Sequence, residues 1–219
     1  GDVYKRQTSD FAAIWTLGKF LLASYAALIT MYLIHLIILG VLGVNPVRYV
    51  KKTLEVLIFA FTSRSSAGSL PLNIQTQTQR LGVPEGIANF SATFGLSIGQ
   101  NGCAGIYPAM LAIMVAPVAH VHIDFQFVIT LIAVVIISSF GVAGVGGGAT
   151  FASILVLSTL NLPVALAGVL ISIEPLIDMG RTALNVNDSI LAGTGTARLT
   201  KNWDKQTFES NNYGELSSN

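Results

Sequence analysis

Long uncharged stretches dominate the chain, and short polar segments separate them. No Lys, Arg, Asp or Glu occurs in Phe20–Val47, in Gly86–Ile123 or in Phe125–Ile173. A helix of about 20 apolar residues crosses the hydrocarbon core of a bilayer, so each stretch can hold a span. The pattern therefore predicts an all-α membrane protein.

The last of these stretches is interrupted near its middle by a glycine-rich segment, FGVAGVGGGAT at 140–150. The apolar arms on either side are each too short to cross a bilayer. Irregular backbone at membrane depth is tolerated only where protein buries it or where it lines a cavity. We therefore expect a re-entrant helical hairpin over 126–161, with its tip at a polar site.

A second segment has the same form. LEVLIFAFTSRSSAGSLP at 54–71 is a short apolar arm followed by a tip of Ser, Arg and Gly, which predicts a re-entrant hairpin over 46–80. Between the two hairpins, FGLSIGQNGCAG at 94–105 puts glycines in mid-span and predicts a partly unwound helix. Two such hairpins in corresponding positions indicate an inverted repeat around a site at the membrane midplane.

These boundaries give the expected organisation. Residues 1–7, GDVYKRQ, resemble a translated sequencing-adapter scar and are set aside as non-native. Residues 8–200 form a partial transport unit, expected to be the C-terminal part of a longer protein, and 201–219 form a polar cytoplasmic tail with a disordered end. The unit comprises a span at 11–44, a hairpin at 46–80, a span at 84–119, a hairpin at 126–161 and a span at 163–197.

The composition agrees with a membrane protein. Of the residues, 52% are hydrophobic and 11% are charged, against about 25% charged in soluble domains. The net charge is +1, and no basic run is interleaved with aromatics, which argues against nucleic-acid binding. Basic residues follow the first span, the first hairpin and the last span, so positive-inside reasoning places these ends in the cytoplasm and 116–124 outside. The two hairpins then enter from opposite sides.

Polar residues gather on one face of the last predicted span. Ionisable residues inside a span usually face the bundle interior and mark ligand or ion paths. A zwitterionic amino acid needs a carboxylate for its ammonium group and a guanidinium for a carboxylate. The alternative is an internal ion pair between Asp178 and Arg181 that only joins helices. In a helix over 170–195 the following lie within about 60° of Asp178: Glu174, Arg181, Thr182, Asn185 and Ser189.

The hairpin tips offer complementary groups. Serines and glycines at 65–69, and the glycines at 144–148, can present hydroxyls and backbone N–H groups to an anion; the alternative for each tip is a flexible loop. Arg64 has three candidate partners: Asp178, a second carboxylate on a ligand, or the hairpin itself. His35 is expected to be a packed polar residue rather than a proton relay. No His or Lys base is placed near Cys103, so an intramembrane hydrolase is set aside.

Three motifs together resemble a known family. SRSSAGSLP (63–71), GVAGVGGGA (141–149) and DMGRTALNV (178–186) are similar to the first hairpin, second hairpin and last helix of the dicarboxylate/amino acid:cation symporter family, the glutamate transporter homologues. Within it, SIGQNGCAGIYPAMLA (97–112) is similar to the bacterial L-cystine uptake branch. The resemblance implies a glutamate-transporter-like transport domain without its N-terminal scaffold, which forms a homotrimer in the full-length family.

The resemblance also implies the substrate contacts. Asp178 matches the partner of the substrate ammonium, and Arg181 matches the partner of the distal carboxylate. The other matching positions are Arg64 (through its carbonyl), Ser66, Cys103, Val145, Ala149, Thr182 and Asn185.

The cation sites of the family match less well. Two carboxylates of the family are replaced by Asn101 and Ser189, and Asp188 lies about 80° off the polar face. Hard cations prefer anionic oxygens, so we expect fewer coupling sodium ions than in the glutamate branch, or protons, and no other cofactor. The candidate cation ligands are Gly95, Ser97, Gly99, Asn101, Ser139, Phe140, Val142, Asn185 and Ser189.

The sequence thus predicts a secondary active transporter, not an enzyme, that imports an amino acid by cation-coupled alternating access, with L-cystine as the leading substrate. A sodium/dicarboxylate or acidic amino acid symporter is the close alternative. An ion channel or a structural membrane subunit is the alternative from another class. The expected setting is a multi-pass protein of the bacterial plasma (inner) membrane, with a small amino acid and membrane lipid as partners.

Overall fold

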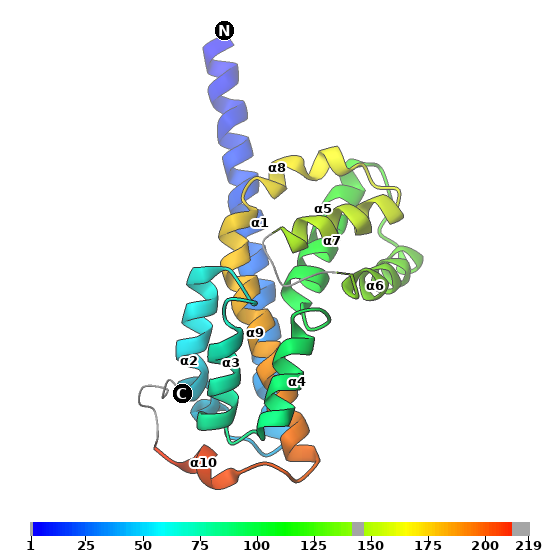
Figure 1. Cartoon of the computed structure of the whole chain (residues 1–219). Coiled ribbons are helices and arrows are strands. Elements are labelled where there is room, and N and C mark those ends of the chain that lie inside the picture. Colours follow the sequence, from blue (N-terminus) through cyan, green and yellow to red (C-terminus); the bar gives the residue numbers. More distant parts are fainter. Residues whose placement is uncertain (1, 142–146, 212–219) are drawn as a thin grey trace.

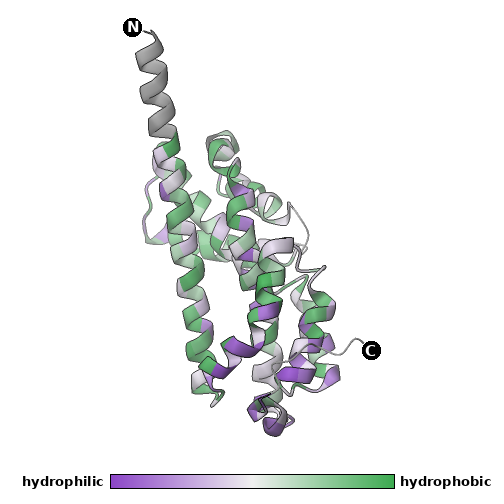
Figure 2. Ribbon diagram, turned by 90° about the vertical axis from the view of Figure 1, so that its left-hand side faces the viewer, coloured by the Kyte–Doolittle hydropathy of each residue, from purple (hydrophilic) through white to green (hydrophobic). Residues whose placement is uncertain are grey.

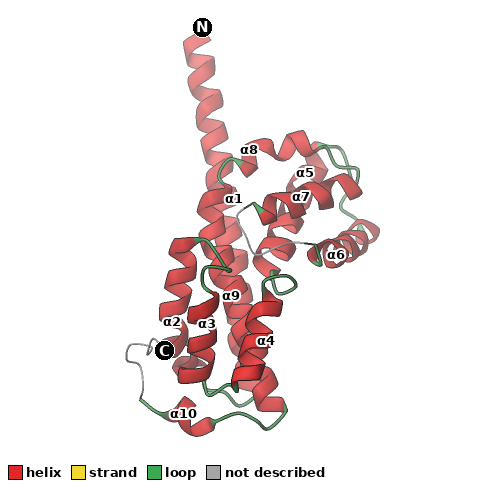
Figure 3. Cartoon of the chain, in the orientation of Figure 1, coloured by secondary structure: helices red, strands yellow, loops and turns green. Residues whose placement is uncertain are grey.

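The computed structural model describes residues 2–141 and 147–211, without the side chains of residues 2–13 and 166. This described part is helical and contains no strand (Figure 3), in agreement with the predicted all-α class. The tip of the second predicted hairpin, with Val142 and Val145, lies outside the described residues.

Helix α1 (Asp2–Val41) is the longest element and extends well beyond the others at its N-terminal end (Figure 1). Its segment Ile14–Val41 is long and apolar enough to cross a membrane, and so is the segment Asn101–Val118. Large apolar side chains such as Leu22, Ile37 and Val41 are exposed on α1, and green, hydrophobic positions run along it (Figure 2). Exposed apolar surface on this scale needs a cover, and lipid is the cover that suits such a helix.

The segment predicted as the first hairpin is a helix, a turn and a returning helix. Helix α2 (Pro46–Ser63) begins after Asn45, whose side-chain oxygen accepts the backbone N–H of Arg48, and ends at Arg64, which has a left-handed φ of 55°. The chain returns through α3 (Leu70–Gln75) and the π-helical turn η1 (Thr76–Arg80). The turn at 64–69 therefore lies where the Ser- and Gly-rich tip was expected.

The next segment is interrupted, as its glycines predict. Helix α4 (Glu85–Gly95) ends before residues 96–100, and the chain continues through the π-helical segment η2 (Asn101–Ile106) into α5 (Tyr107–Val118). The break leaves backbone groups near Gly95 and Gly102 outside regular helix. Both glycines lie against the last long helix of the chain.

Short helices lie at the upper right of the molecule in Figure 1, beside α1. They are α6 (Phe125–Ser139), α7 (Gly148–Thr159), the 3-10 turn η3 (Val164–Ala167) and α8 (Gly168–Ile171). Asp124 caps α6 by accepting the backbone N–H of Phe127 at 2.7 Å. Helix α7 packs against α5, and Ala149, near the start of α7, is buried.

Helix α9 (Glu174–Leu199) is the central element and packs against α1, α2 and α4. It begins at Glu174, later than the predicted span boundary at 163, because Pro175 occupies the first turn, where its missing N–H costs nothing. Glycines on α9 allow close approach: a Cβ on Gly180 would lie 2.9 Å from the Tyr25 ring. The polar face of α9 is enclosed as well, since Asp178, Arg181 and Asn185 are all buried.

The start of the predicted polar tail is ordered. Helix α10 (Lys205–Glu209) follows Asp204, which caps it. The Trp203 indole donates to the Leu81 carbonyl at 2.7 Å, the Asp204 N–H donates to the Gly82 carbonyl at 2.9 Å, and Phe208 is only 2% exposed. We call residues 203–210 the C-terminal clasp, because they close over the base of α2 and the turn that follows η1.

Candidate functional site

The guanidinium of Arg181 is at the centre of a buried charged cluster. Arg181 lies in the middle of α9 and is 0% exposed. Its Nη2 donates to Glu174 and, at 3.0 Å, to the Asp178 carboxylate, and its Cζ lies 4.1 Å from the centroid of the Tyr107 ring. Its Nε and Nη1 have no hydrogen-bond partner among the described residues. Arg181 therefore has donors left for another acceptor.

The carboxylate of Asp178 is held between two guanidinium groups. Arg64 Nε lies 2.9 Å from Asp178 Oδ2, while Arg181 binds the other carboxylate oxygen. Of the three candidate partners of Arg64, the structure shows Asp178. The Arg64 side chain is 39% exposed and the Asp178 side chain 8%, so this pair links the buried cluster to the turn of the first hairpin segment. With Glu174, the cluster contains two cations and two anions.

Asn185 joins α9 to the interrupted segment. Its Oδ1 accepts the Gly102 N–H at 2.8 Å, and its Nδ2 donates to Gln100 Oε1 at 2.9 Å and to Cys103 Sγ at 3.0 Å. A Cβ on Gly102 would lie 3.0 Å from the Arg181 carbonyl oxygen, so a larger residue would push the break away from α9. Asn185 thus fixes the break beside the charged cluster, with both ends of its amide already bonded.

The structure joins Arg64, Asp178 and Arg181 in one cluster, and Asn185 and Cys103 in an adjacent one on the same helix. The other described substrate positions are buried: Ser66 is 6%, Thr182 3% and Ala149 2% exposed. Residue Glu174, which shares the predicted polar face, was not among the predicted contacts, although it binds Arg181. Tyr107 was also missed, because an aromatic in an apolar run carries no polar signal.

Several candidate cation ligands line a cavity of about 220 Å³ between α4 and α9, namely Gly95, Gly99 and Ser189. The Gly95 carbonyl accepts Gln100 Nε2 at 2.9 Å, and the Ser189 hydroxyl donates to Val186 and accepts from Asn73, both at 2.8 Å. These oxygens are thus already engaged within the protein. The charged residue on this cavity is Asp188, which was not among the predicted ligands.

The other candidate cation ligands differ in exposure and in hydrogen bonding. Ser97 and Phe140 are exposed, and the Ser139 hydroxyl donates to the Ile136 carbonyl at 2.7 Å. The described residues contain no group of three or more His, Cys, Asp or Glu that could hold a metal ion. The candidate cation ligands among the described residues are therefore oxygen donors without a cluster of carboxylates.

His35 lies in a buried polar network next to this cavity. It is 3% exposed, as expected of a packed polar residue. Its Nε2 lies 3.2 Å from the Asn101 amide and 3.6 Å from Asp188 Oδ1, and its Nδ1 lies 3.0 Å from the Asn187 amide. A histidine in an apolar span was the signal for such a network, but its partners come from distant segments.

Comparison with known proteins relates this architecture to a transporter family. Residues 4–199 match the sodium:dicarboxylate symporter family. The match begins inside the stretch 1–7, which was expected to be non-native. It includes all the helices from α2 to α9.

Several curated relatives are similar over most of the chain. "L-cystine uptake protein TcyP" of Bacillus licheniformis is 67% identical over 203 residues, which are 92% of this chain and 44% of the relative. The protein of the same name from Shouchella clausii is 66% identical over 94% of this chain and 44% of the relative. That of Bacillus cereus is 59% identical over 96% of this chain and 46% of the relative.

The chain thus spans less than half the length of these relatives. The family and the relatives are named for symport and uptake and not for an enzymatic reaction, in agreement with the prediction that the chain is not an enzyme. The resemblance stated from the three motifs is confirmed.

Proposed function

Because the chain belongs to the sodium:dicarboxylate symporter family, we propose that it forms the substrate-binding part of a secondary transporter that imports L-cystine across the bacterial plasma membrane. Its relatives carry the name of L-cystine uptake proteins. We further propose that the segments 46–80 and 126–161 are re-entrant hairpins, and that an N-terminal scaffold and a homotrimer complete the full-length protein.

One observation carries this proposal: Arg181 is fully buried, yet two of its nitrogens, Nε and Nη1, lack a partner among the described residues. A buried donor without an acceptor costs roughly 1–3 kcal/mol, and more when it is charged. A protein that keeps such donors gains when a ligand supplies the acceptor. A carboxylate fits best, because the guanidinium fork binds two oxygens at once.

Asp178 provides the second half of the recognition. In the present state its carboxylate binds Arg64 and Arg181. A ligand ammonium would replace Arg64, the more exposed of the two partners, while a ligand carboxylate takes the free donors of Arg181. L-Cystine carries two ammonium and two carboxylate groups, so it can meet both demands; a dicarboxylate lacks the ammonium group, and we therefore rank it second.

Burial of Arg181 also argues for a moving element. A ligand cannot reach a side chain with no exposed surface unless a neighbouring segment opens. Alternating access in this family type supplies such a motion, with the 126–161 segment as the outer gate and the 46–80 segment on the cytoplasmic side. Cation coupling completes the proposal, with Asp188 and the oxygens near Gly95 as a weak site for sodium, or with protons as the coupling ion.

The experiment is uptake of labelled L-cystine by vesicles that contain the full-length protein carrying this sequence. The matched variants are Asp178→Asn, expected to abolish uptake, and Asp204→Asn in the clasp, expected to leave it unchanged. Excess aspartate or succinate should compete weakly. Strong competition by either one favours the acidic amino acid or dicarboxylate alternative, and a substrate-independent current that survives Asp178→Asn favours a channel.

The coupling ion is tested in the same vesicles. Sodium is replaced by choline, with and without an inward proton gradient. Uptake that persists in choline and rises with the proton gradient supports proton coupling. Complete dependence on sodium, with several ions carried per cystine, contradicts the expectation of fewer coupling sodium ions.

A further inference from the structure

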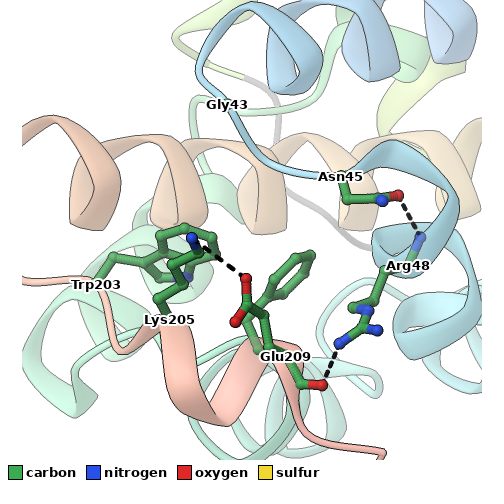
Figure 4. Close-up of a pocket in the computed structure, with 7 residues that line it drawn as sticks. Gly43, Asn45, Arg48, Trp203, Lys205 and Glu209 are labelled. Atoms are coloured by element: carbon green, nitrogen blue, oxygen red, sulfur yellow. Dashed lines mark hydrogen bonds and ion pairs between the residues drawn. The ribbon is translucent and has the colours of Figure 1, made fainter.

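A cavity of about 460 Å³ opens between the corner that joins α1 to α2 and the C-terminal clasp (Figure 4). We propose that it binds the phosphate of an anionic phospholipid headgroup. The proposal rests on the membrane placement of the chain but not on its substrate. The cavity is lined by Gly43, Asn45, Arg48, Trp203, Lys205, Phe208 and Glu209.

The position of the cavity along the chain corresponds to the headgroup layer. The apolar segment that can cross a membrane ends at Val41, and the lining residues begin at Gly43. Val41 is 83% and Val47 66% exposed on either side of this corner. Trp203, a residue type enriched at the membrane–water interface, forms part of the opposite wall. A lipid seated against the two valines would thus carry its headgroup to the cavity.

The charges of the lining favour an anion. Arg48 and Lys205 approach the cavity from opposite walls, as Figure 4 shows. Behind Gly43, the guanidinium of Arg198 lies 3.5 Å from the position of a Cβ on that glycine and 5.7 Å from the Trp203 ring. Two cations line the cavity, and a third lies directly behind its wall.

One acidic residue also lines the cavity. The carboxylate of Glu209 lies 3.3 Å from Lys205 Nζ, and its backbone carbonyl accepts Arg48. A phosphate would compete with this carboxylate for Lys205. Glu209 therefore tunes the site, and its removal should strengthen anion binding, whereas removal of either cation should weaken it.

A lipid is favoured over a soluble anion because the exposed apolar residues Val41 and Val47 flank the lining residues Gly43 and Asn45 in the sequence. A soluble phosphate would gain from the cations alone. A lipid gains from the cations and keeps its acyl chains against Val41 and Val47. Bound there, it would also join the α1–α2 corner to the clasp, since the two walls belong to these two segments.

The test uses the full-length protein in detergent and counts retained lipid by native mass spectrometry. The probes are dioctanoyl phosphatidylglycerol, dioctanoyl phosphatidylcholine and inorganic phosphate. Each basic residue near a membrane surface contributes about a fivefold gain in affinity for anionic lipid. We expect Lys205→Gln to weaken phosphatidylglycerol binding about fivefold and Glu209→Gln to strengthen it by a similar factor. The matched control is Lys201→Gln, an exposed cation at the same end of the molecule that does not line the cavity.

The outcomes separate the sources of the anion. Phosphatidylglycerol retained in preference to phosphatidylcholine, with opposite effects of the two variants, supports the proposal. It is overturned by equal retention of both lipids, by displacement of the lipid with equimolar inorganic phosphate, or by a loss in Lys201→Gln as large as that in Lys205→Gln. Glu209→Gln decides the matter if Lys205→Gln does not fold, because a site without anion binding would gain nothing from it.

Discussion

The attachment of the C-terminal clasp can be tested by one substitution, Gly82→Ala. Gly82 has a φ of +71°, and its carbonyl accepts the Asp204 N–H at 2.9 Å. A Cβ on Gly82 would overlap the Asp204 carbonyl oxygen and would lie 3.0 Å from the Asp204 carbonyl carbon. These are backbone atoms, so no side-chain rotation relieves the overlap. The clasp has to move away from the turn that follows η1.

Two costs set the scale of the effect. A left-handed conformation costs a non-glycine residue about 1–2 kcal/mol. Release of the clasp exposes Phe208, now 2% exposed, and burial of such a side chain contributes about 1.5–3 kcal/mol. The clasp is therefore expected to be open most of the time in Gly82→Ala, since the overlap with backbone atoms exceeds what its contacts can offset.

Hydrogen exchange measures this directly on the full-length protein. The Asp204 amide is protected by its bond to the Gly82 carbonyl, and we expect peptides covering 203–210 to lose protection in Gly82→Ala. The matched control is Gly86→Ala, four residues further on in α4, where a Cβ would meet nothing within 4 Å. Equal protection of 203–210 in both variants would refute the close packing of the clasp against Gly82.

Three further outcomes are expected. Arg181→Lys keeps the charge but loses the planar fork, so the KM for L-cystine uptake should rise about 10- to 100-fold; an unchanged KM would make Arg181 purely structural. Gly193→Ala places a Cβ against Gln77, a fully buried side chain, and overpacking of this kind costs about 1–3 kcal/mol, seen as a lower Tm of the purified protein. Hydrogen bonds from Thr207 hold the pKa of the Asp204 carboxyl below its usual range. Since the lowered folded-state pKa stabilises the clasp above the unfolded value near pH 4, the protection factors at 203–210, taken relative to intrinsic exchange at the same pH, should fall only as the pH drops below about 4, and Asp204→Asn should remove that dependence.

Local sequence signals predicted the interruptions of the fold. Glycines marked the break at 96–100, where the backbone packs closely: a Cβ on Gly95 would lie 2.7 Å from Ser189 Cβ. The Ser- and Gly-rich tip marked the turn at 64–69, although the residue with the left-handed φ there is Arg64. The face of α9 was predicted because it depends only on helical spacing. Within the predicted span 163–197, Pro175 is the signal for a helix that begins at Glu174.

Contacts between distant segments could not be predicted in the same way. The sequence left three partners open for Arg64, and only the packing of the turn against α9 selects Asp178. The sequence predicts a polar tail, but the Trp203 indole donates to the Leu81 carbonyl, and Phe208 packs in the apolar cluster that includes the base of α2. Asp188 was placed off the polar face, which was defined by the substrate groups. Asp188 instead lines the cavity between α4 and α9.

The network around His35 bears on the coupling ion, because a neutral imidazole has one N–H and one acceptor nitrogen. The buried Tyr49 hydroxyl donates to Asn187 Oδ1 at 2.9 Å, so the Asn187 nitrogen faces His35 Nδ1 and donates to it. The ring proton then lies on Nε2, which faces the Asn101 amide and, at 3.6 Å, the Asp188 carboxylate.

An Nε2–H needs an acceptor, so the oxygen of the Asn101 amide has to point toward His35. If the Asn187 amide were reversed instead, the Tyr49 hydroxyl would lose its acceptor, Asn187 Oδ1. With the amide nitrogen facing His35, Asn101 Oδ1 is a buried oxygen with no partner among the described residues. Turning the amide gives this oxygen the Nε2–H of His35 as its donor. The nitrogen of Asn101 then points away from His35, and an N–H donor there repels a cation. Asn101 is thus a poor cation ligand in this state, and an ion bound in the cavity between α4 and α9 would depend on the Asp188 carboxylate. Asp188→Asn should therefore alter the cation dependence of uptake, while Asn101→Ala should leave it nearly unchanged.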